Sequence, residues 1–112
     1  MKLYTKLYLE NQNTYLLGPG RMELLRTVGE FGSLRQAAQK MGMSHRWAWG
    51  RIKDTEKSLG VELLGHNETS GKSKHLTAQG KELLAWYDTV QEELAQVLTR
   101  AQRTRPDFLR KG

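Results

Sequence analysis

The side chains best suited to bind a partner are basic residues clustered between positions 44 and 57, in the run SHRWAWGRIKDTEK. In a helix, Arg46, Lys53 and Lys57 would share one face, because residues three, four and seven positions apart lie on the same side. A guanidinium group on such a helix can donate two hydrogen bonds to the O6 and N7 atoms of guanine in the major groove of DNA. We therefore expect Arg46 to contact a base, and Lys53 and Lys57 to contact phosphates. The alternative for each is an ordinary solvated charge.

Five further residues flank this basic face. Ser44 and His45 open the same expected helix and would contact a base or a phosphate. Arg35 and Gln36 open the preceding helix, and they would contact the DNA backbone as that helix crosses it. Trp47 is expected to pack at the edge of the core. Its alternatives are stacking on a sugar or a thymine methyl group, or a place in a protein interface.

No arrangement of residues points to catalysis or to metal binding. His45, His66 and His75 fall in different expected elements and lack carboxylate or metal-ligand spacing. The sequence holds no cysteine, which excludes disulfides, thiolate metal sites and cysteine nucleophiles. It also holds no phosphate-binding P-loop and no nucleophile elbow. We expect no enzyme, no cofactor and no metal, and no small-molecule effector is evident.

The charge of the 112 residues is unevenly distributed around a net value of +6. Residues 33–75 hold eight lysines and arginines against four acidic residues, net +4, and residues 100–112 hold five against one, also net +4. Between them, residues 76–99 hold one lysine against four acidic residues, net −3. This pattern favours a protein that presents one face to a polyanion. No apolar run approaches the roughly 20 residues that cross a bilayer, and no signal peptide is recognisable, so we expect a cytoplasmic protein without a membrane partner.

Two short helices joined by a tight corner would position the basic residues. Ser33 and Gln36 form a capping box at the start of the first helix. Gly42 can adopt the left-handed backbone conformation that ends the first helix, and Ser44 caps the second helix. Each helix carries an apolar stripe at helical spacing: Leu34, Ala37, Ala38 and Met41 in the first, and Ala48, Ile52, Thr55 and Leu59 in the second. This pattern is typical of a helix-turn-helix.

A β-hairpin and a helix are expected before this unit. Leucines alternate with polar residues from position 3 to 10, which predicts a half-buried strand, and residues 14–17 would return as a second strand after a turn at 11–13. An isolated hairpin is marginal in water, so it should dock on the main domain. Its tyrosines are expected to pack across the strands, with stacking on bases as the alternative. Residues 21–31 should form a helix, with Leu24, Leu25, Val28 and Phe31 on its inner side.

A second hairpin is expected after the helix-turn-helix. Residues 61–64 and 75–76 read as two strands around a polar stretch, GHNETSGKSK. A hairpin in this place is a wing, and Lys72 and Lys74 near its tip would contact phosphates or the minor groove. The alternative is a solvated loop whose lysines contact nothing.

The last element is a long helix that begins at Thr77, with Gly80 as an early weak point, and runs to about Gln102, roughly 39 Å at 1.5 Å per residue. Its apolar residues have the spacing of a coiled-coil seam: Leu83, Tyr87, Val90, Leu94, Val97 and Ala101. We expect its first part to pack on the core and the rest to pair with a second copy. The alternative is a helix folded wholly on its own domain. Residues 103–112 should be a frayed basic tail.

Several blocks together resemble a known family: GPGRMELLRTVGEFGSLRQAAQKMGMSHRWAW, IKDTEKSLGVELL, TSGKSKHLTAQGKELL and the long helix behind them. They are similar to the DNA-binding domain of the molybdate-responsive ModE regulators, which belong with the LysR-type winged helices. The resemblance covers residues 18–87, about two thirds of the chain. It implies a homodimer whose recognition helices enter successive major grooves and whose long helices form the interface. It also implies that Trp49 packs against the wing or the last helix.

Three departures from that family bear on function. The chain ends after the long helix, so we expect no oxyanion-binding domain and no molybdate sensing. The wing is poorer in glycine than is usual in the family. Trp47 stands where a lysine or arginine is common, and Gly50 where an aspartate is common, so the sequence preference should differ.

Together these patterns predict a mainly α protein with a small β content. The β-hairpin would span residues 1–18, the winged helix-turn-helix 19–76, and the dimerisation helix with its tail 77–112. The predicted function is that of a homodimeric transcriptional regulator that binds double-stranded DNA sequence-specifically. The alternatives are a winged-helix protein-interaction module and a non-specific architectural DNA binder.

Overall fold

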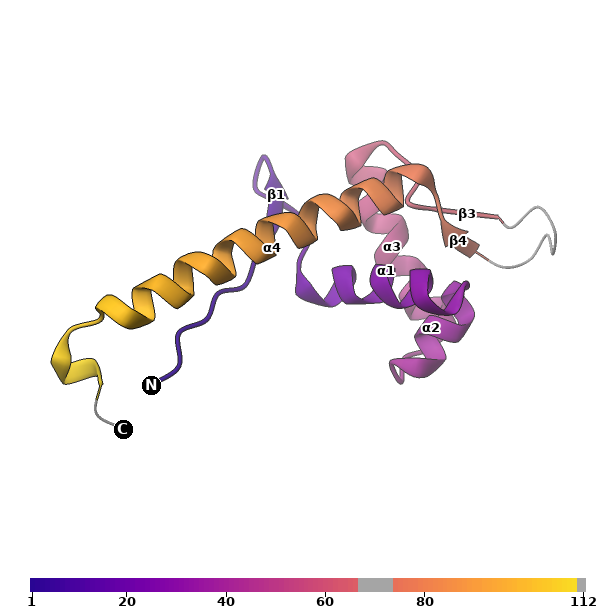
Figure 1. The fold of residues 1–112 in the computed structure, drawn as a ribbon. Coiled ribbons are helices and arrows are strands. Elements are labelled where there is room, and N and C mark those ends of the chain that lie inside the picture. Colours follow the sequence, from indigo (N-terminus) through magenta and orange to yellow (C-terminus); the bar gives the residue numbers. More distant parts are fainter. Residues whose placement is uncertain (67–73, 111–112) are drawn as a thin grey trace.

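A computed structural model describes residues 1–66 and 74–110 of the chain. Its elements, in order, are β1 (Leu9–Asn11), β2 (Thr14–Leu17), α1 (Pro19–Phe31), α2 (Leu34–Lys40), α3 (His45–Leu59), β3 (Leu64–His66), β4 (Lys74–Leu76), α4 (Ala78–Thr104) and the 3-10 turn η1 (Asp107–Leu109). The strands form two separate antiparallel hairpins, β1–β2 and β3–β4. The expected class, mainly α with small β, is confirmed (Figure 1). None of the described helices combines the length and the apolar character needed to cross a membrane.

Local sequence signals define the ends of α2 and α3. The hydroxyl of Ser33 accepts the N–H of Gln36 at 3.1 Å, and that of Ser44 accepts the N–H of Trp47 at 3.1 Å. Gly42, in the corner between the helices, has the positive φ of 70° that glycine adopts without strain. The first three helices enclose the core with these residues: Leu24, Leu25, Val28, Leu34, Ala37, Ala38, Ala48 and Ile52. Phe31 was wrongly expected among them. It is the last residue of α1 and 44% exposed, with the ammonium of Lys40 5.9 Å from its ring centre.

The N-terminal hairpin is shorter than expected. Its first strand contains only three residues, because β2 is four residues long and leaves nothing for the chain before Leu9 to pair with. Gln12 and Asn13 form the turn with positive φ values of 50° and 68°, the sign that a two-residue type I′ turn requires. The hairpin docks on α3 where the hydroxyl of Thr55 donates to the carbonyl of Leu16 at 2.5 Å. The rings of Tyr8 and Tyr15 lie 6.3 Å apart, as expected for cross-strand packing.

The wing strands are brief. Leu64 pairs with Leu76, and β3 begins there rather than at Val61, which is 39% exposed. The chain then enters α4 through Thr77, whose hydroxyl accepts the N–H of Gly80 at 3.0 Å. Gly80 is a point of close packing rather than a weak point, since a Cβ atom there would lie 2.4 Å from a backbone oxygen of residue 63.

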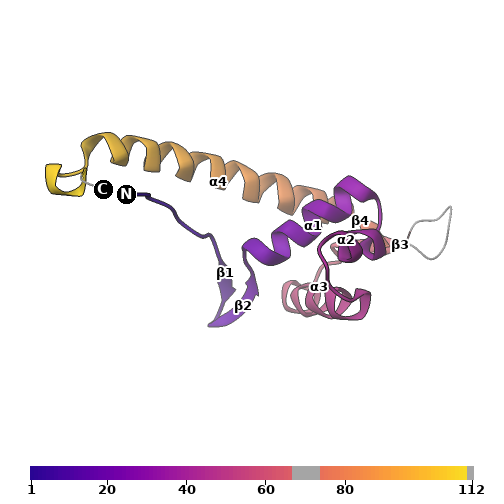
Figure 2. The same ribbon diagram turned by 90° about the horizontal axis from the view of Figure 1, so that it is seen from below.

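Helix α4 packs on the core only over its first turns and then extends away from it (Figures 1 and 2). The Cα radius of gyration is 17.2 Å, whereas a compact domain of this length has about 13 Å. Residues 1–8 run beside the distal part of α4, and both ends of the chain lie near its far end. Residues 103–110 of the tail are not frayed as expected: residues 107–109 form a turn, and Arg110 donates to the carbonyl of Arg103 at 3.0 Å. Residues 111–112 of the predicted tail lie outside the described residues.

Candidate nucleic-acid interface

The outer face of α3 presents two free cations. Arg46 lies in the first turn of the helix and Lys57 near its end, and both are exposed, whereas Ala48 and Ile52 on the opposite side are buried. Within residues 1–66 and 74–110, neither cation makes a hydrogen bond or an ion pair. Gly50 lies on the same face, and a Cβ atom there would meet nothing within 4 Å. The face is therefore open, with its charges available to a partner.

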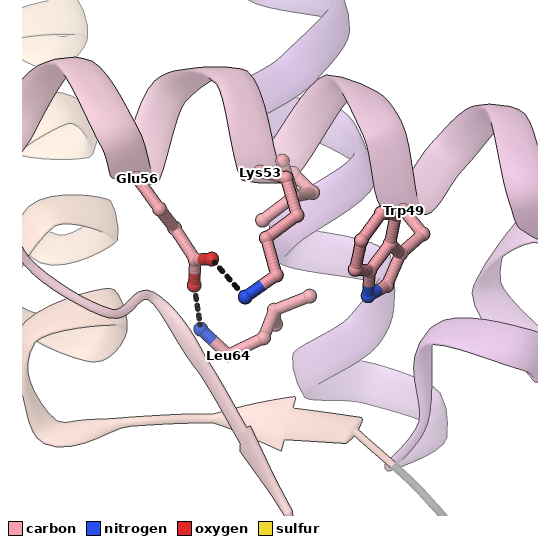
Figure 3. Close-up of a pocket in the computed structure, with 5 residues that line it drawn as sticks. Trp49, Lys53, Glu56 and Leu64 are labelled. Carbon is pink, nitrogen blue, oxygen red and sulfur yellow. Dashed lines mark hydrogen bonds and ion pairs between the residues drawn. The ribbon is translucent and has the colours of Figure 1, made fainter.

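Lys53 differs from Arg46 and Lys57, because it has partners within the chain. Its ammonium lies 3.4 Å from Oε1 of Glu56 and 5.5 Å from the ring centre of Trp49. The other carboxylate oxygen of Glu56 accepts the backbone N–H groups of Leu63 and Leu64 at 2.8 and 3.0 Å. Figure 3 shows the bond from Leu64. Glu56 is 7% exposed, so this carboxylate is a buried link between α3 and the wing.

Glu56 was not among the site residues predicted from the sequence. The signal was present, because it follows Ile52 by one helical turn and so lies beside the apolar stripe. An acidic residue in that place needs donors, and the two N–H groups at the start of β3 supply them.

The two tryptophans of α3 lie on opposite flanks of the open face. Trp49 lines a small depression together with Leu64 of the wing, which supports the expected packing on that side (Figure 3). Trp47 is 53% exposed and lies near the N-terminal hairpin, where the guanidinium of Arg51 stands 5.0 Å from its ring centre. Trp47 is therefore a half-exposed residue on the hairpin side.

The remaining predicted contact residues surround this face unevenly. Arg35 and Gln36 are exposed at the start of α2, and His45 is partly buried at the start of α3. The backbone N–H of Gln36 is capped, but within the described part of the chain its side chain makes no bond back to residue 33. Lys74 pairs with residue 66 through the β4 backbone, and Lys72 lies outside the described residues.

The predicted dimer seam on α4 divides into two parts. Leu83 packs against the core, and Tyr87 is 1% exposed, with its hydroxyl donating to the carbonyl of Leu7 at 2.8 Å. Tyr87 is therefore a core residue, and its assignment to an interface was wrong. Burial raises the pKa of its phenol, and the nearby guanidinium of Arg26 opposes that rise. The distal seam residues keep accessible surface: Val90, Leu94, Val97 and Ala101.

The profile of the bacterial regulatory helix-turn-helix proteins, lysR family, matches residues 20–81, which run from α1 through the wing into α4. The chain belongs to this LysR family. The match covers more than half of the sequence and includes every element of the helix-turn-helix and the wing.

This LysR-family chain is similar to two curated relatives that are both named as transcriptional regulators or activators. It is 34% identical over 93 residues to the transcriptional regulator ModE of Yersinia pestis, covering 78% of this chain and 35% of that protein. It is 37% identical over 82 residues to the HTH-type transcriptional activator AllS of Salmonella typhi, covering 67% of this chain and 27% of that protein. The chain thus spans about a third of the length of these relatives.

Solved structures share the fold. A DNA-binding-domain structure described as the CbnR_DBD–DNA complex is similar with a TM-score of 0.59 and 22% identity, over 76% of this chain and 94% of that chain. ArgP from Mycobacterium tuberculosis is similar with a TM-score of 0.53 and 25% identity, over 78% of this chain and 31% of that one. Over the described residues, no cluster of three or more histidine, aspartate or glutamate side chains could hold a metal ion.

Proposed function

We propose that this protein is a transcriptional regulator that binds duplex DNA sequence-specifically, as a cytoplasmic homodimer without a catalytic role. The observation that carries this proposal is the open face of α3, where Arg46 and Lys57 are exposed and unpaired. An α-helix with free cations fits the major groove. The relatives named as transcriptional regulators, and the similar domain solved with DNA, support the same reading.

The contacts of the helix residues are assigned by position on the fold, and those of Lys72 and Lys74 follow from the sequence. Arg46 is in the first turn of α3, where side chains of a recognition helix reach base edges, so it reads a base. Ser44 and His45 lie beside it and contact a base or a phosphate. The remaining residues contact the sugar-phosphate backbone: Arg35, Gln36, Trp47, Lys53 and Lys57 from the helices, and Lys72 and Lys74 from the wing.

The distal half of α4 is the proposed dimer interface. Its seam residues are Val90, Leu94, Val97 and Ala101, which lie beyond the core. The charges of the helix are segregated: residues 81–93 contain four acidic residues and one lysine, and residues 100–105 contain three arginines. An antiparallel pair would place the acidic half of one helix against the basic half of its partner. Opposite charges beside an apolar seam favour that orientation.

Selection of bound duplexes from a randomised pool, at near-physiological salt, tests the proposal. Enrichment of a two-fold symmetric site is the expected result. The affinity should also fall on a log–log plot against salt, with a slope of about −0.9 per phosphate neutralised. Retention without enrichment would indicate an architectural DNA binder, and no retention even at low salt would indicate a protein-interaction module.

A further inference from the structure

A pocket lies on the hairpin side of α3, apart from the open face. It has a volume of about 280 Å³ and is bounded by α1, α3 and β2. Its lining residues are Tyr15, Gly20, Arg21, Leu24, Trp47 and Arg51. None of these except Trp47 has a role in the proposed DNA contacts.

Aromatic and aliphatic surface makes up much of the lining. Each aromatic ring is covered on one face by a guanidinium group. The Cζ atom of Arg21 is 4.6 Å from the ring centre of Tyr15, and that of Arg51 is 5.0 Å from the ring centre of Trp47. Such cation–π stacks hold the guanidinium groups and the rings in fixed mutual positions. Leu24, at 1% exposure, adds apolar surface from α1.

The two cations of the pocket are incompletely neutralised. Arg51 is balanced by Asp54, whose Oδ2 atom lies 3.2 Å from its Nη2 atom. Arg21 donates only to neutral acceptors, the carbonyl of Leu16 at 3.0 Å and the hydroxyl of Thr55 at 2.9 Å. In the described part of the chain it has no carboxylate partner. One positive charge at the pocket is therefore unbalanced.

One hydrogen-bond donor at the pocket is also unused. The Nε–H of Arg51 is inaccessible to solvent and has no acceptor among the described residues. Buried donors in folded proteins are nearly always paired, because an unpaired one costs about 1–3 kcal/mol. An acceptor supplied by a ligand would remove that cost once the Arg51 side chain turns this N–H toward the pocket.

We propose that this pocket binds a small planar aromatic anion, such as an aromatic monocarboxylate. The apolar body would lie against Trp47, Tyr15 and Leu24, and the carboxylate would face the guanidinium groups of Arg21 and Arg51. The volume is close to the lower end of small-molecule sites, about 300 Å³, which suits a ligand of one or two fused rings. This goes beyond the proposed function, since binding here requires no DNA.

Gly20 allows the pocket to be filled without changing its charges. It lines the pocket from the first turn of α1, and a Cβ atom there would meet nothing within 4 Å. Gly20→Leu should therefore occupy the space that the ligand needs, while Gly20→Ala should leave most of it free. The two variants form a matched pair outside the DNA-contacting residues.

The test is titration of the DNA-free protein with 2-naphthoate, followed by calorimetry and by the indole N–H signal of Trp47, assigned with Trp47→Phe. We expect saturable one-to-one binding and a shift of that signal. The neutral analogue 2-naphthalenemethanol should bind about tenfold more weakly, since it loses a charge-assisted hydrogen bond. Gly20→Leu should lower the affinity for 2-naphthoate at least about tenfold, and Gly20→Ala should retain the wild-type affinity.

Several results would overturn the proposal: no binding of 2-naphthoate to the wild type, equal binding of the neutral analogue, or undiminished binding to Gly20→Leu. If Gly20→Leu does not fold, Arg51→Gln takes its place, with the exposed Arg100→Gln as its control. Arg51→Gln should lower the affinity for 2-naphthoate about tenfold, and Arg100→Gln should leave it unchanged. Equal affinities of the two variants for 2-naphthoate would likewise reject the site. Since no DNA is present, failure here is distinct from failure of the proposed function.

Discussion

Arg46 and Lys57 share one exposed face of α3 but lie at opposite ends of it, and this separates their proposed roles. A side chain in the first turn of a recognition helix reaches base edges, whereas one three turns later meets the backbone. Both are free of partners within the described residues, so neither replacement breaks an internal contact. Differences in binding can then be assigned to the DNA.

Arg46→Ala should reduce the free energy of binding to the selected site by about 1–3 kcal/mol and relax the sequence preference at one base pair. Lys57→Ala should weaken binding to all DNA sequences alike. It should also reduce the magnitude of the slope of log affinity against log salt concentration by about 1. Binding isotherms on the selected duplex and its single-base variants, at several salt concentrations, measure both effects. If Arg46→Ala weakens every duplex equally, Arg46 has no base-reading role.

Tyr87 makes a second residue-scale prediction, for alkaline pH. Burial raises the pKa of its phenol above the ordinary value of about 10. A raised pKa in the folded state means that the stabilisation from the protonated phenol is complete below the unfolded-state pKa. It is lost as the pH rises through the folded-state pKa. The free energy of unfolding should therefore fall more steeply above pH about 10 in the wild type than in Tyr87→Phe.

Tyr87→Phe also removes the hydrogen bond to the carbonyl of Leu7, so it should lower the free energy of unfolding by about 1 kcal/mol at neutral pH. Urea denaturation of both proteins between neutral pH and pH about 11 measures the two effects. Tyr4→Phe is the control, because Tyr4 is 67% exposed. Parallel pH profiles for the wild type and Tyr87→Phe would show that the phenol is not responsible.

Residues with local roles were predictable, and residues with distant partners were not. Ser33, Gly42 and Ser44 act on backbone groups within a few positions, so their types identify the helix ends directly. Tyr87 has the spacing of a seam residue, but its partner is 80 positions away at Leu7. No periodicity within α4 contains that information.

At the scale of elements, the wing is held to α3 by one buried carboxylate. Glu56→Ala would leave the N–H groups of Leu63 and Leu64 without their acceptor. Unpaired buried donors are costly, so we expect the free energy of unfolding to fall by about 3 kcal/mol. Thermal and urea denaturation measure this. Asp54→Ala, which removes an exposed carboxylate from the same helix, should change the free energy of unfolding by less than about 0.5 kcal/mol.

Gly80 makes the second element-scale prediction, at the junction of the wing with α4. Helix propensity alone would make Gly80→Ala stabilising by about 1 kcal/mol. However, its Cβ atom would lie 2.4 Å from a backbone oxygen of residue 63, which forces the elements apart. We expect a net loss of about 2 kcal/mol in the free energy of unfolding. Gly50→Ala is the matched control, since its Cβ meets nothing within 4 Å, and it should be stabilising. A gain for both variants would contradict the close approach.

Element types could be predicted more readily than element lengths. Alternation from residue 3 to 10 indicated a strand, but a strand extends only as far as its partner, and β2 begins at Thr14 and ends at Leu17. The exposure of Trp47 depends likewise on where the hairpin docks against α3, through Thr55 and Leu16. Such limits come from the packing of separate segments.

For the molecule as a whole, the elongated shape raises the question of what covers α4. Its first turns pack on the core through Leu83, Leu84 and Tyr87, and Arg26 of α1 pairs with Asp88 one position later. Beyond that point the helix extends from the core beside residues 1–8. The length of the apolar seam was the only feature of the sequence that indicated a core-packed first part and an extended distal part of α4. It did not indicate where core packing ends, because that depends on the N-terminal segment reaching Tyr87.

The distal seam provides the test of assembly. Leu94→Glu places a charge among apolar residues that would be buried in the proposed dimer, so it should produce a monomer in sedimentation equilibrium. Gln96→Glu, which adds the same charge at an exposed position off the seam, should leave the mass unchanged. Both variants should keep the wild-type free energy of unfolding within about 1 kcal/mol if the monomer's core ends near Tyr87.

Loss of the dimer also has a consequence for DNA. Each protomer alone would contact one half-site, so Leu94→Glu should lose the preference for a two-fold symmetric duplex while it still binds a single half-site weakly. A monomeric Leu94→Glu that binds the full site as tightly as the wild type would separate DNA recognition from dimerisation. A dimeric Leu94→Glu would place the interface elsewhere on the molecule.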